Sequence, residues 1–196
     1  ALAEAHDWTG EMEPSELKGL RATLTADPAA LADRSFFIVT VPTPIDREKR
    51  PDLTPVLGAC DTIGKALRDY RGQGGPVPLI VFESTVYPGL TEEVCGPRIA
   101  SVSGKERGTY FRLGYSPERI NPGDKVHRLE TITKIIAAED AESLERMEKI
   151  YGTVVSAGLH KAQSIAVAEA AKVLENTQRD LNVALMNELA LICDRM

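Results

Sequence analysis

The sequence predicts an α/β fold of the doubly wound type, followed by one long helix. Short apolar runs rich in β-branched residues alternate along the chain with segments whose apolar residues recur at helical spacing. Residues 163–196 then contain neither Gly nor Pro over about nine helical turns. We therefore expect a parallel sheet with crossover helices, and a helical unit that begins where the sheet ends.

Four segments are predicted to form strands. Residues 35–41 (SFFIVTV) and 78–83 (PLIVFE) are unbroken apolar runs, which are typical of strands buried on both faces. Residues 110–115 and 132–137 are two further candidates. If all four strands are parallel, their carboxyl ends meet at one edge of the sheet.

The helices are predicted from apolar spacing and from end signals. Asp27 before Pro28 and Asp140 before residues 141–151 are capping residues, whereas Gly152 should end the second of these helices. A break is expected at Gly96-Pro97. The predicted helices begin near Pro14 and Pro28 and span residues 52–70, 91–100, 140–151 and 163–196.

The last helix has two faces in its first half and is apolar almost all round in its second half. One face of the helical wheel carries Val167, Ala170, Leu174, Leu181, Leu185 and Ile192, and the opposite face carries Glu169, Lys172, Asn176 and Arg179. Periodicity alone favours a solvated polar face. The apolar second half should pack against another domain or a second copy of the chain. We expect one domain over residues 1–161 and another over 162–196.

Composition excludes several classes of function. The 196 residues carry a formal charge of -6, which disfavours nucleic acid, and no apolar run is long enough to cross a bilayer. The first residues lack the basic and apolar regions of a signal peptide, so a cytoplasmic location is expected. Cys60, Cys95 and Cys193 are odd in number and widely spaced, so we predict packing roles and neither disulfides nor a metal site.

Three unusual loops follow three of the predicted strands. They are VPTPI at 41–45, ESTV at 83–86 and SPERINPGD at 116–124. Each alone could be a turn or a helix cap. Ligands of open α/β sheets bind at the carboxyl ends of the strands, so polar loops after successive strands indicate a ligand site.

Four segments resemble the nucleotide-sugar 6-dehydrogenases, the UDP-glucose/GDP-mannose dehydrogenase family. They are VPTPID at 41–46, ESTVYPG at 83–89, GYSPERINPGD at 114–124 and AEAAKVLENTQRDLNVALMNE at 168–188. The resemblance covers essentially the whole chain and is greatest to the bacterial UDP-N-acetylglucosamine and UDP-N-acetylgalactosamine 6-dehydrogenases. It implies a partial Rossmann-like NAD-binding domain, followed by the long helix of an all-α dimerisation domain that forms a homodimer through residues 163–196.

The resemblance also implies a reaction. Such enzymes oxidise the C6 alcohol of a UDP-sugar to the uronic acid with NAD, for surface polysaccharide biosynthesis. The implied cofactor-binding residues are Val41, Pro42, Thr43, Pro44, Ser84, Thr85 and Val86. The implied catalytic residues are Lys172, Asn176, Glu118 and Thr85, and substrate contacts come from Glu118, Arg119, Ile120, Asn121, Lys172 and Asn176.

These residue types suit that reaction. A lysine ammonium and an asparagine amide can stabilise negative charge on the C6 oxygen, whereas a carboxylate can orient water or move protons. Lys172 and Asn176 are one helical turn apart and therefore lie on one face. This match reverses the interpretation of the polar face as merely solvated.

Two parts of the family pattern do not occur in this sequence. The chain has no GxGxxG turn for the cofactor pyrophosphate, and no cysteine matches the nucleophile that the family carries in a separate UDP-binding domain. Pro122 stands where the UDP-glucose branch has a second glutamate. We therefore expect a fragment of a dehydrogenase that is inactive by itself.

Two other interpretations of the sequence compete with the enzyme. The chain could be a non-catalytic dimerising module derived from such an enzyme. A dehydrogenase of the phosphogluconate type would explain the Lys-to-Asn spacing, but not the loops STVYPG and SPERINPGD. The sequence does not decide which sugar epimer is oxidised.

Overall fold

The structure is a computed structural model that describes residues 7, 14–19, 21–72, 74–118 and 131–196. Its elements, in chain order, are α1 (Pro14–Lys18), η2 (Pro28–Leu31), β1 (Phe36–Val39), α2 (Thr54–Arg68), β2 (Leu79–Phe82), η3 (Leu90–Cys95), α3 (Gly96–Ser103), β3 (Arg112–Tyr115), β4 (Lys134–Ala138), α4 (Ala141–Tyr151), β5 (Leu159–Lys161) and α5 (Ile165–Arg195). The four predicted strands and the predicted helices are thus confirmed. Most are shorter than predicted, whereas the helical segment predicted at 91–100 extends over 90–103.

The five strands form one sheet in the order β1-β2-β3-β4-β5. The first three are parallel, as expected, but β4 runs antiparallel to β3 and parallel to β5. The expectation of an all-parallel sheet is therefore wrong for the last two strands. An antiparallel neighbour can pair without a crossover helix, which a parallel neighbour requires.

Strand β5 was missed because its sequence carries a weak strand signal. Only three residues pair with β4, and two of them, His160 and Lys161, are polar and exposed. The periodicity of alternating apolar residues cannot be recognised over so short a segment.

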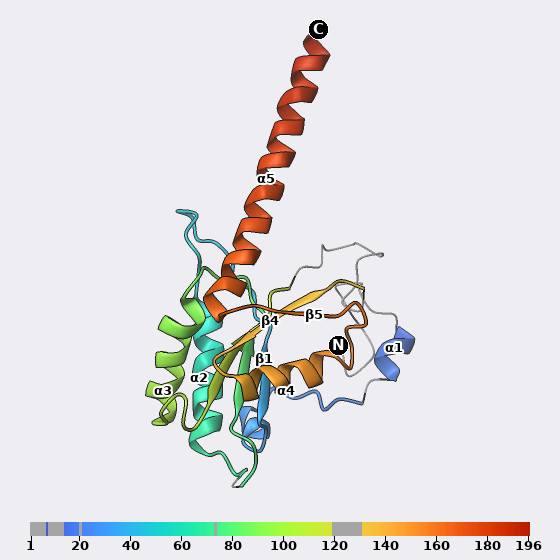
Figure 1. Cartoon of the computed structure of the whole chain (residues 1–196). Coiled ribbons are helices and arrows are strands. Elements are labelled where there is room, and N and C mark those ends of the chain that lie inside the picture. The colour runs from blue at the N-terminus through green and yellow to red at the C-terminus, as the bar shows by residue number, and fades with distance from the viewer. Residues whose placement is uncertain (1–6, 8–13, 20, 73, 119–130) are drawn as a thin grey trace.

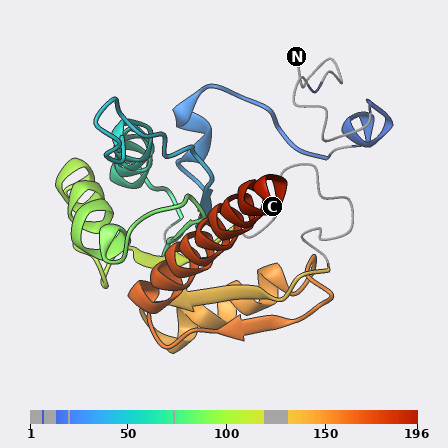
Figure 2. The same cartoon turned by 90° about the horizontal axis from the view of Figure 1, so that it is seen from above.

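Helices cover both faces of the sheet. α2 and α3 pack against each other on one face, while α4 covers the opposite face (Figures 1 and 2). The larger apolar core lies under α2 and α3 and includes Val56, Ile80, Phe82, Ile99 and Leu113, whereas the smaller core lies under α4. All four residues of β2 are buried, as its unbroken apolar sequence predicts.

The helical segment after β2 does not end at Gly96-Pro97, where the sequence predicted a break, but changes its type there. η3 is a π-helix that passes directly into α3 at Gly96. A Cβ atom on Gly96 would lie 3.0 Å from Leu113 Cδ1 and 3.2 Å from Arg107 Nη1, so a side chain here would require these two neighbours to shift by a few tenths of an ångström. Gly89, just before η3, has a φ of 95°, in the left-handed region.

α5 contacts the sheet domain through its first turns only and then projects away from it (Figure 1). Ser164 caps the helix, because its side chain accepts a hydrogen bond from Val167 N. The described helices include none that is both long and apolar enough to span a bilayer.

For the first turns of α5, the helical wheel predicted the wrong face to be buried. Glu169 is fully buried, although it lies on the predicted solvated face, and Val167 is 50% exposed, although it lies on the predicted apolar face. Glu169 can be buried because the amides of Gly89 and Thr91 donate hydrogen bonds to its carboxylate. The apolar periodicity of a helix contains no information about such donors.

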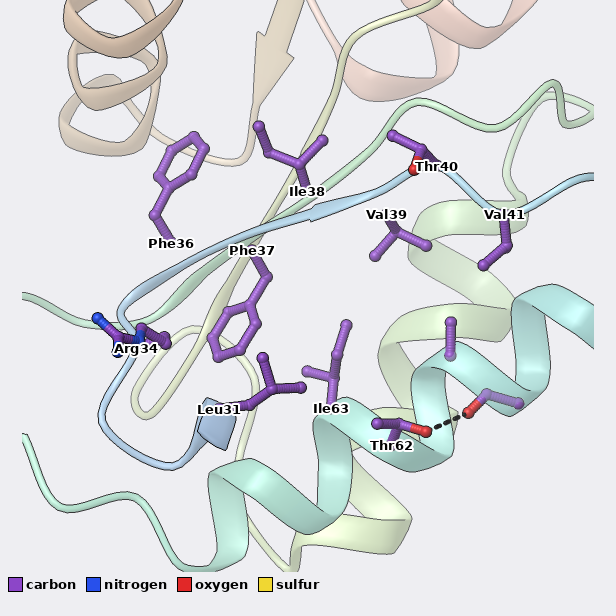
Figure 3. Close-up of a pocket in the computed structure, with 12 residues that line it drawn as sticks. Leu31, Arg34, Phe36, Phe37, Ile38, Val39, Thr40, Val41, Thr62 and Ile63 are labelled. Atoms are coloured by element: carbon purple, nitrogen blue, oxygen red, sulfur yellow. Dashed lines mark hydrogen bonds between the residues drawn. The ribbon is translucent and has the colours of Figure 1, made fainter. Parts of the chain in front are cut away.

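An apolar groove of about 550 Å³ borders the edge strand β1 (Figure 3). Phe37 and Val39 point from β1 toward Ile63 of α2, while Phe36 and Ile38 point to the other side of the strand. This groove does not contain the predicted catalytic residues, which lie at the carboxyl ends of the strands and on α5.

Candidate functional site

The loops after β1 and β2 are held together by reciprocal hydrogen bonds. The hydroxyl of Ser84 donates to the carbonyl oxygen of Val41 at 2.5 Å, and the hydroxyl of Thr43 donates to the carbonyl oxygen of Thr85 at 2.6 Å. Because β1 and β2 are parallel and in register, their carboxyl ends bring the two loops side by side. Each loop therefore fixes the other.

Tyr115, at the end of β3, contacts the loop that follows β2. Its hydroxyl donates to the carbonyl oxygen of Ser84 at 3.1 Å, and its side chain is fully buried. Burial, together with the negative charge of Glu169, raises the pKa of Tyr115 above the ordinary value of a phenol. The phenol therefore stays protonated at neutral pH and remains a donor.

A buried lysine lies between the loops that follow β2 and β3. Lys134 is 4% exposed, and its Nζ lies 3.5 Å from Glu83 Oε1 and 4.0 Å from Glu118 Oε2. Its ammonium also lies 5.3 Å from the ring centroid of Tyr151. We call Glu83, Glu118, Lys134 and Tyr151 the Lys134 cluster.

Tyr151 completes the Lys134 cluster from α4, where its hydroxyl donates to Glu83 Oε1. Burial first, and then the charge of Glu83, raise the pKa of Tyr151 above its ordinary value. Sequence reasoning missed Glu83, Lys134 and Tyr151 as members of a site. The available signal was a lysine inside an apolar strand, which is rarely buried unless it is paired.

α5 reaches the same edge of the sheet. The ammonium of Lys172 donates a hydrogen bond to the main-chain carbonyl of Glu118 in the third loop. Asn176 lies one turn further along α5 and is exposed. Lys172 therefore lies beside the loop that follows β3, whereas Asn176 shares its helix face without a contact to that loop that the structure shows.

A cavity of about 460 Å³ opens between the first two loops and α5. It is lined by Thr43, Ile45, Pro51, Leu53, Thr85, Val86, Tyr87 and Val173. Its walls are mainly apolar, with the threonine side chains as polar groups. Sites for small molecules commonly combine apolar walls with a few placed polar groups.

The structure brings together most of the predicted site residues that it describes. Val41, Pro42, Thr43, Pro44, Ser84, Thr85 and Val86 lie in the two bonded loops, and Glu118 contacts Lys172. Arg119, Ile120 and Asn121 lie outside the described residues, as does Pro122. In the described ranges, no three His, Cys, Asp or Glu side chains cluster in a way that could hold a metal ion.

The cysteines divide into two groups. Cys60 and Cys95 are buried, as expected for packing residues, whereas Cys193 is exposed on α5 in the single chain. Hydrogen bonding to Cys60 and burial raise the pKa of Cys95, so its thiol stays protonated. A packing role for Cys193 would require a partner on α5.

Comparison with known families matches nearly the whole chain in two pieces. Residues 12–155 match the NAD binding domain of the UDP-glucose/GDP-mannose dehydrogenase family, and residues 166–196 match the central domain of that family.

Two curated relatives are UDP-N-acetyl-D-glucosamine 6-dehydrogenases. The protein from Salmonella typhi is 50% identical over 96% of this chain, and the protein from Pseudomonas aeruginosa is 49% identical over 100% of it. Protein CapL from Staphylococcus aureus is 50% identical over 100% of this chain. The chain spans 42% to 45% of the length of these relatives.

Solved structures show the same architecture. A ternary complex of GDP-mannose dehydrogenase from Pseudomonas aeruginosa matches 95% of this chain and 43% of its own, with a TM-score of 0.84 at 25% identity. The UDP-D-ManNAc dehydrogenase from Pyrococcus horikoshii matches 97% of this chain and 45% of its own, with a TM-score of 0.82 at 28% identity. Together with the family match over residues 12–155, these likenesses show that the chain belongs to the UDP-glucose/GDP-mannose dehydrogenase family.

Proposed function

We propose that this chain supplies part of the active centre of an NAD-dependent UDP-sugar 6-dehydrogenase. The enzyme would oxidise the C6 alcohol of a UDP-N-acetylhexosamine to the uronic acid for surface polysaccharide biosynthesis. The observation that carries the proposal is the contact between Lys172 of α5 and Glu118, beside the two bonded loops. The names of the relatives at 49% and 50% identity support the substrate class.

The cavity beside the bonded loops fits part of an NAD molecule. Thr43, Thr85 and Val86 line it and belong to the predicted cofactor residues, and its apolar walls suit a planar ring. The oxidation of an alcohol to an acid removes two hydrides from C6 in succession, and NAD, when bound, would supply the acceptor for each of them. The rigid loops would hold the ring in one orientation, which a hydride transfer requires.

Lys172 and Asn176 would stabilise the reacting oxygen. As the alcohol becomes a carbonyl, its oxygen loses a proton and gains negative character before the double bond is complete. A fixed cation near that oxygen is worth more in the transition state than in the bound alcohol. Asn176, on the same face of α5, would aim a neutral donor at the same atom.

Glu118 would accept the proton of the C6 alcohol, and Thr85 would orient a water molecule. The side chain of Glu118 lies 4.0 Å from Lys134 Nζ, so its carboxylate is held beside a buried cation at the loop. A carboxylate placed there can accept the proton of the alcohol, directly or through water. Thr85 is exposed at the cavity and can orient that water by its hydroxyl.

A chimera tests this proposal. The chain replaces the segment that it matches in the Pseudomonas aeruginosa relative, which is 49% identical over all 196 residues. We expect the chimera to form NADH from UDP-N-acetylglucosamine or UDP-N-acetylgalactosamine, with a uronic acid as the product identified by mass spectrometry. A folded chimera that binds NAD+ but oxidises neither sugar would contradict the proposal.

The exposed second half of α5 supports a homodimer as the functional form. Leu181, Leu185, Leu189 and Ile192 are each 43% to 64% exposed in the single chain. This face would equally serve the alternative, a non-catalytic dimerising module. The Lys172 contact favours the enzyme, because dimerisation does not need a lysine at the loops. A cytoplasmic location is part of the proposal, and cell fractionation would test it.

A further inference from the structure

Glu169 is a fully buried carboxylate whose two oxygens are both engaged. Oε2 accepts a hydrogen bond from Gly89 N at 2.6 Å, and Oε1 accepts one from Thr91 N at 3.0 Å. Among the described residues no other acidic side chain is buried to this degree. Burying a carboxylate is unfavourable unless it is hydrogen-bonded, so these two amides are essential partners of Glu169.

The two amides lie where a helix begins without a local cap. Gly89 is the N-cap residue of η3 and has no side chain that could accept a hydrogen bond from the first amides. Glu169, 80 residues later in the chain, supplies that acceptor instead. The negative charge also interacts favourably with the amino-terminal end of the helical stretch that continues through α3.

This contact connects the two parts of the proposed site. Gly89 is four residues after Thr85, and Glu169 is three residues before Lys172, which places Glu169 and Lys172 on neighbouring positions of one helix face. Only Ile165, Ala168 and Glu169 of α5 are buried, so the helix has few other contacts that could fix its position. Apolar contacts such as those of Ile165 and Ala168 are not directional. The two hydrogen bonds to Glu169, by contrast, fix both the distance and the orientation of α5 relative to the start of η3.

We infer that Glu169 is a positioning residue, which fixes Lys172 of α5 relative to the loop of Thr85. Glu169 does not line the proposed cofactor cavity, and its two carboxylate oxygens bond to the amides of Gly89 and Thr91. This inference rests on the proposed function for its catalytic consequence, but the anchoring contact itself can be measured without any activity.

Hydrogen exchange in the 196-residue chain tests the contact. In Glu169→Ala, we expect the amides of Gly89 and Thr91 to exchange at least about tenfold faster, because each loses a hydrogen bond to a charged acceptor. Thr91→Val is the matched control. It keeps the main-chain amide and the shape, and it removes only the Thr91 hydroxyl, which is buried without a partner within the described part of the chain. Unchanged exchange in Glu169→Ala would overturn the inference.

Kinetics in the chimera test the consequence. A displacement of the reacting groups by about 1 Å can cost on the order of a hundredfold in rate. We therefore expect Glu169→Ala to lower kcat per NAD-binding site by that order, with little change in the KM for the UDP-sugar, while Thr91→Val keeps the parental kcat. Glu169→Gln, which retains the shape and one acceptor, should recover part of the loss.

Each outcome has a defined meaning. A folded Glu169→Ala variant with the kcat of Thr91→Val overturns the positioning role, because a merely structural residue changes the yield of folded enzyme and not kcat per site. If Glu169→Ala does not fold, the comparison of Glu169→Gln with Thr91→Val decides in the same way. An inactive parental chimera would contradict the proposed function, and the exchange measurement would then still decide whether Glu169 anchors the loop.

Discussion

The ammonium of Lys172 donates a hydrogen bond to the main-chain carbonyl of Glu118, although 54 residues separate them in the chain. A lysine at the solvated face of a helix would lose side-chain entropy in such a contact without any gain from burial. Here the contact holds a cation at the carboxyl ends of the strands. The position of Lys172 is therefore set by the tertiary structure and suits a role in charge stabilisation.

Replacing Lys172 should affect the chemical step more than binding. Loss of a group that stabilises developing charge typically costs on the order of a hundredfold to a thousandfold in kcat. We expect Lys172→Ala in the chimera to lower kcat by that order with a small change in the KM for NAD+, and Asn176→Ala to act in the same direction more mildly. Steady-state NADH formation measures both.

Arg179→Ala is the control for Lys172. Arg179 pairs with Glu175 on the exposed surface of α5, with 3.2 Å between Nη2 and Oε1. If Lys172→Ala and Arg179→Ala both keep the parental kcat, Lys172 is only a solvated residue and its catalytic assignment is wrong.

Removing the hydroxyl of Ser84 should loosen the two bonded loops. Ser84→Ala deletes the donor to Val41 O, and a hydrogen bond of this kind contributes about 1 kcal/mol to the free energy of unfolding. We expect that loss in urea unfolding and a raised KM for NAD+ in the chimera. Thr62→Val removes an exposed hydroxyl that bonds within its own helix, to Gly58 O, and should leave the KM for NAD+ unchanged. Equal KM values for Ser84→Ala and the parent would show that the loop contact does not shape the cofactor site.

Lys134→Met should destabilise the domain strongly. The change leaves Glu83, which is 13% exposed, beside Tyr151 without its nearby cation. Breaking a buried ion pair by removing one partner typically costs about 3 to 5 kcal/mol. Lys161→Met breaks an exposed pair with Glu148, for which about 1 kcal/mol or less is expected. Equal losses in urea unfolding for the two variants would contradict a special role of Lys134.

The buried tyrosines should make the folded chain sensitive to alkali. Burial raises the pKa of Tyr151 and of Tyr115, so above about pH 10 the unfolded chain releases protons that the folded chain keeps. The free energy of unfolding should therefore fall as pH rises through this range, by about 1.4 kcal/mol per pH unit for each such phenol.

Tyr151→Phe tests this pH dependence, because it should reduce the slope of stability against pH in urea unfolding between about pH 10 and 11. Tyr110→Phe removes a phenol from a side chain that is 55% exposed, and it measures the effect of a solvent-accessible tyrosine. Identical slopes in the two variants would contradict a contribution from burial.

The second half of α5 should mediate self-association of the 196-residue chain. Leu185 is 53% exposed on a helix that also exposes Leu181, Leu189 and Ile192, and apolar surfaces of this extent mark interfaces. We expect sedimentation to show a dimer for the parent and a monomer for Leu185→Asp. Val154→Asp places the same charge at a residue that is 49% exposed away from α5, and it should remain dimeric. A parent that stays monomeric at micromolar concentration would refute the interface.

The sequence by itself determined which segments form strands and helices. The runs at 35–41 and 78–83 became β1 and β2, because burial on both faces leaves an unbroken apolar signature. Asp140 marked the start of α4, because a cap is a local contact between neighbouring residues. The loops that follow β1 and β2 were also located correctly, since they are defined by the ends of those strands.

Only the tertiary structure decided the partners that lie far apart in the chain. The direction of β4, the burial of Glu169 and the Lys134 cluster all involve contacts with other elements, which periodicity does not record. Glu169 shows the reason most clearly: a helical wheel placed it in solvent, but two amides 78 and 80 residues away make its burial favourable. Helix geometry alone fixes which residues share a face. Contacts with the other elements of the fold decide which of those faces is buried.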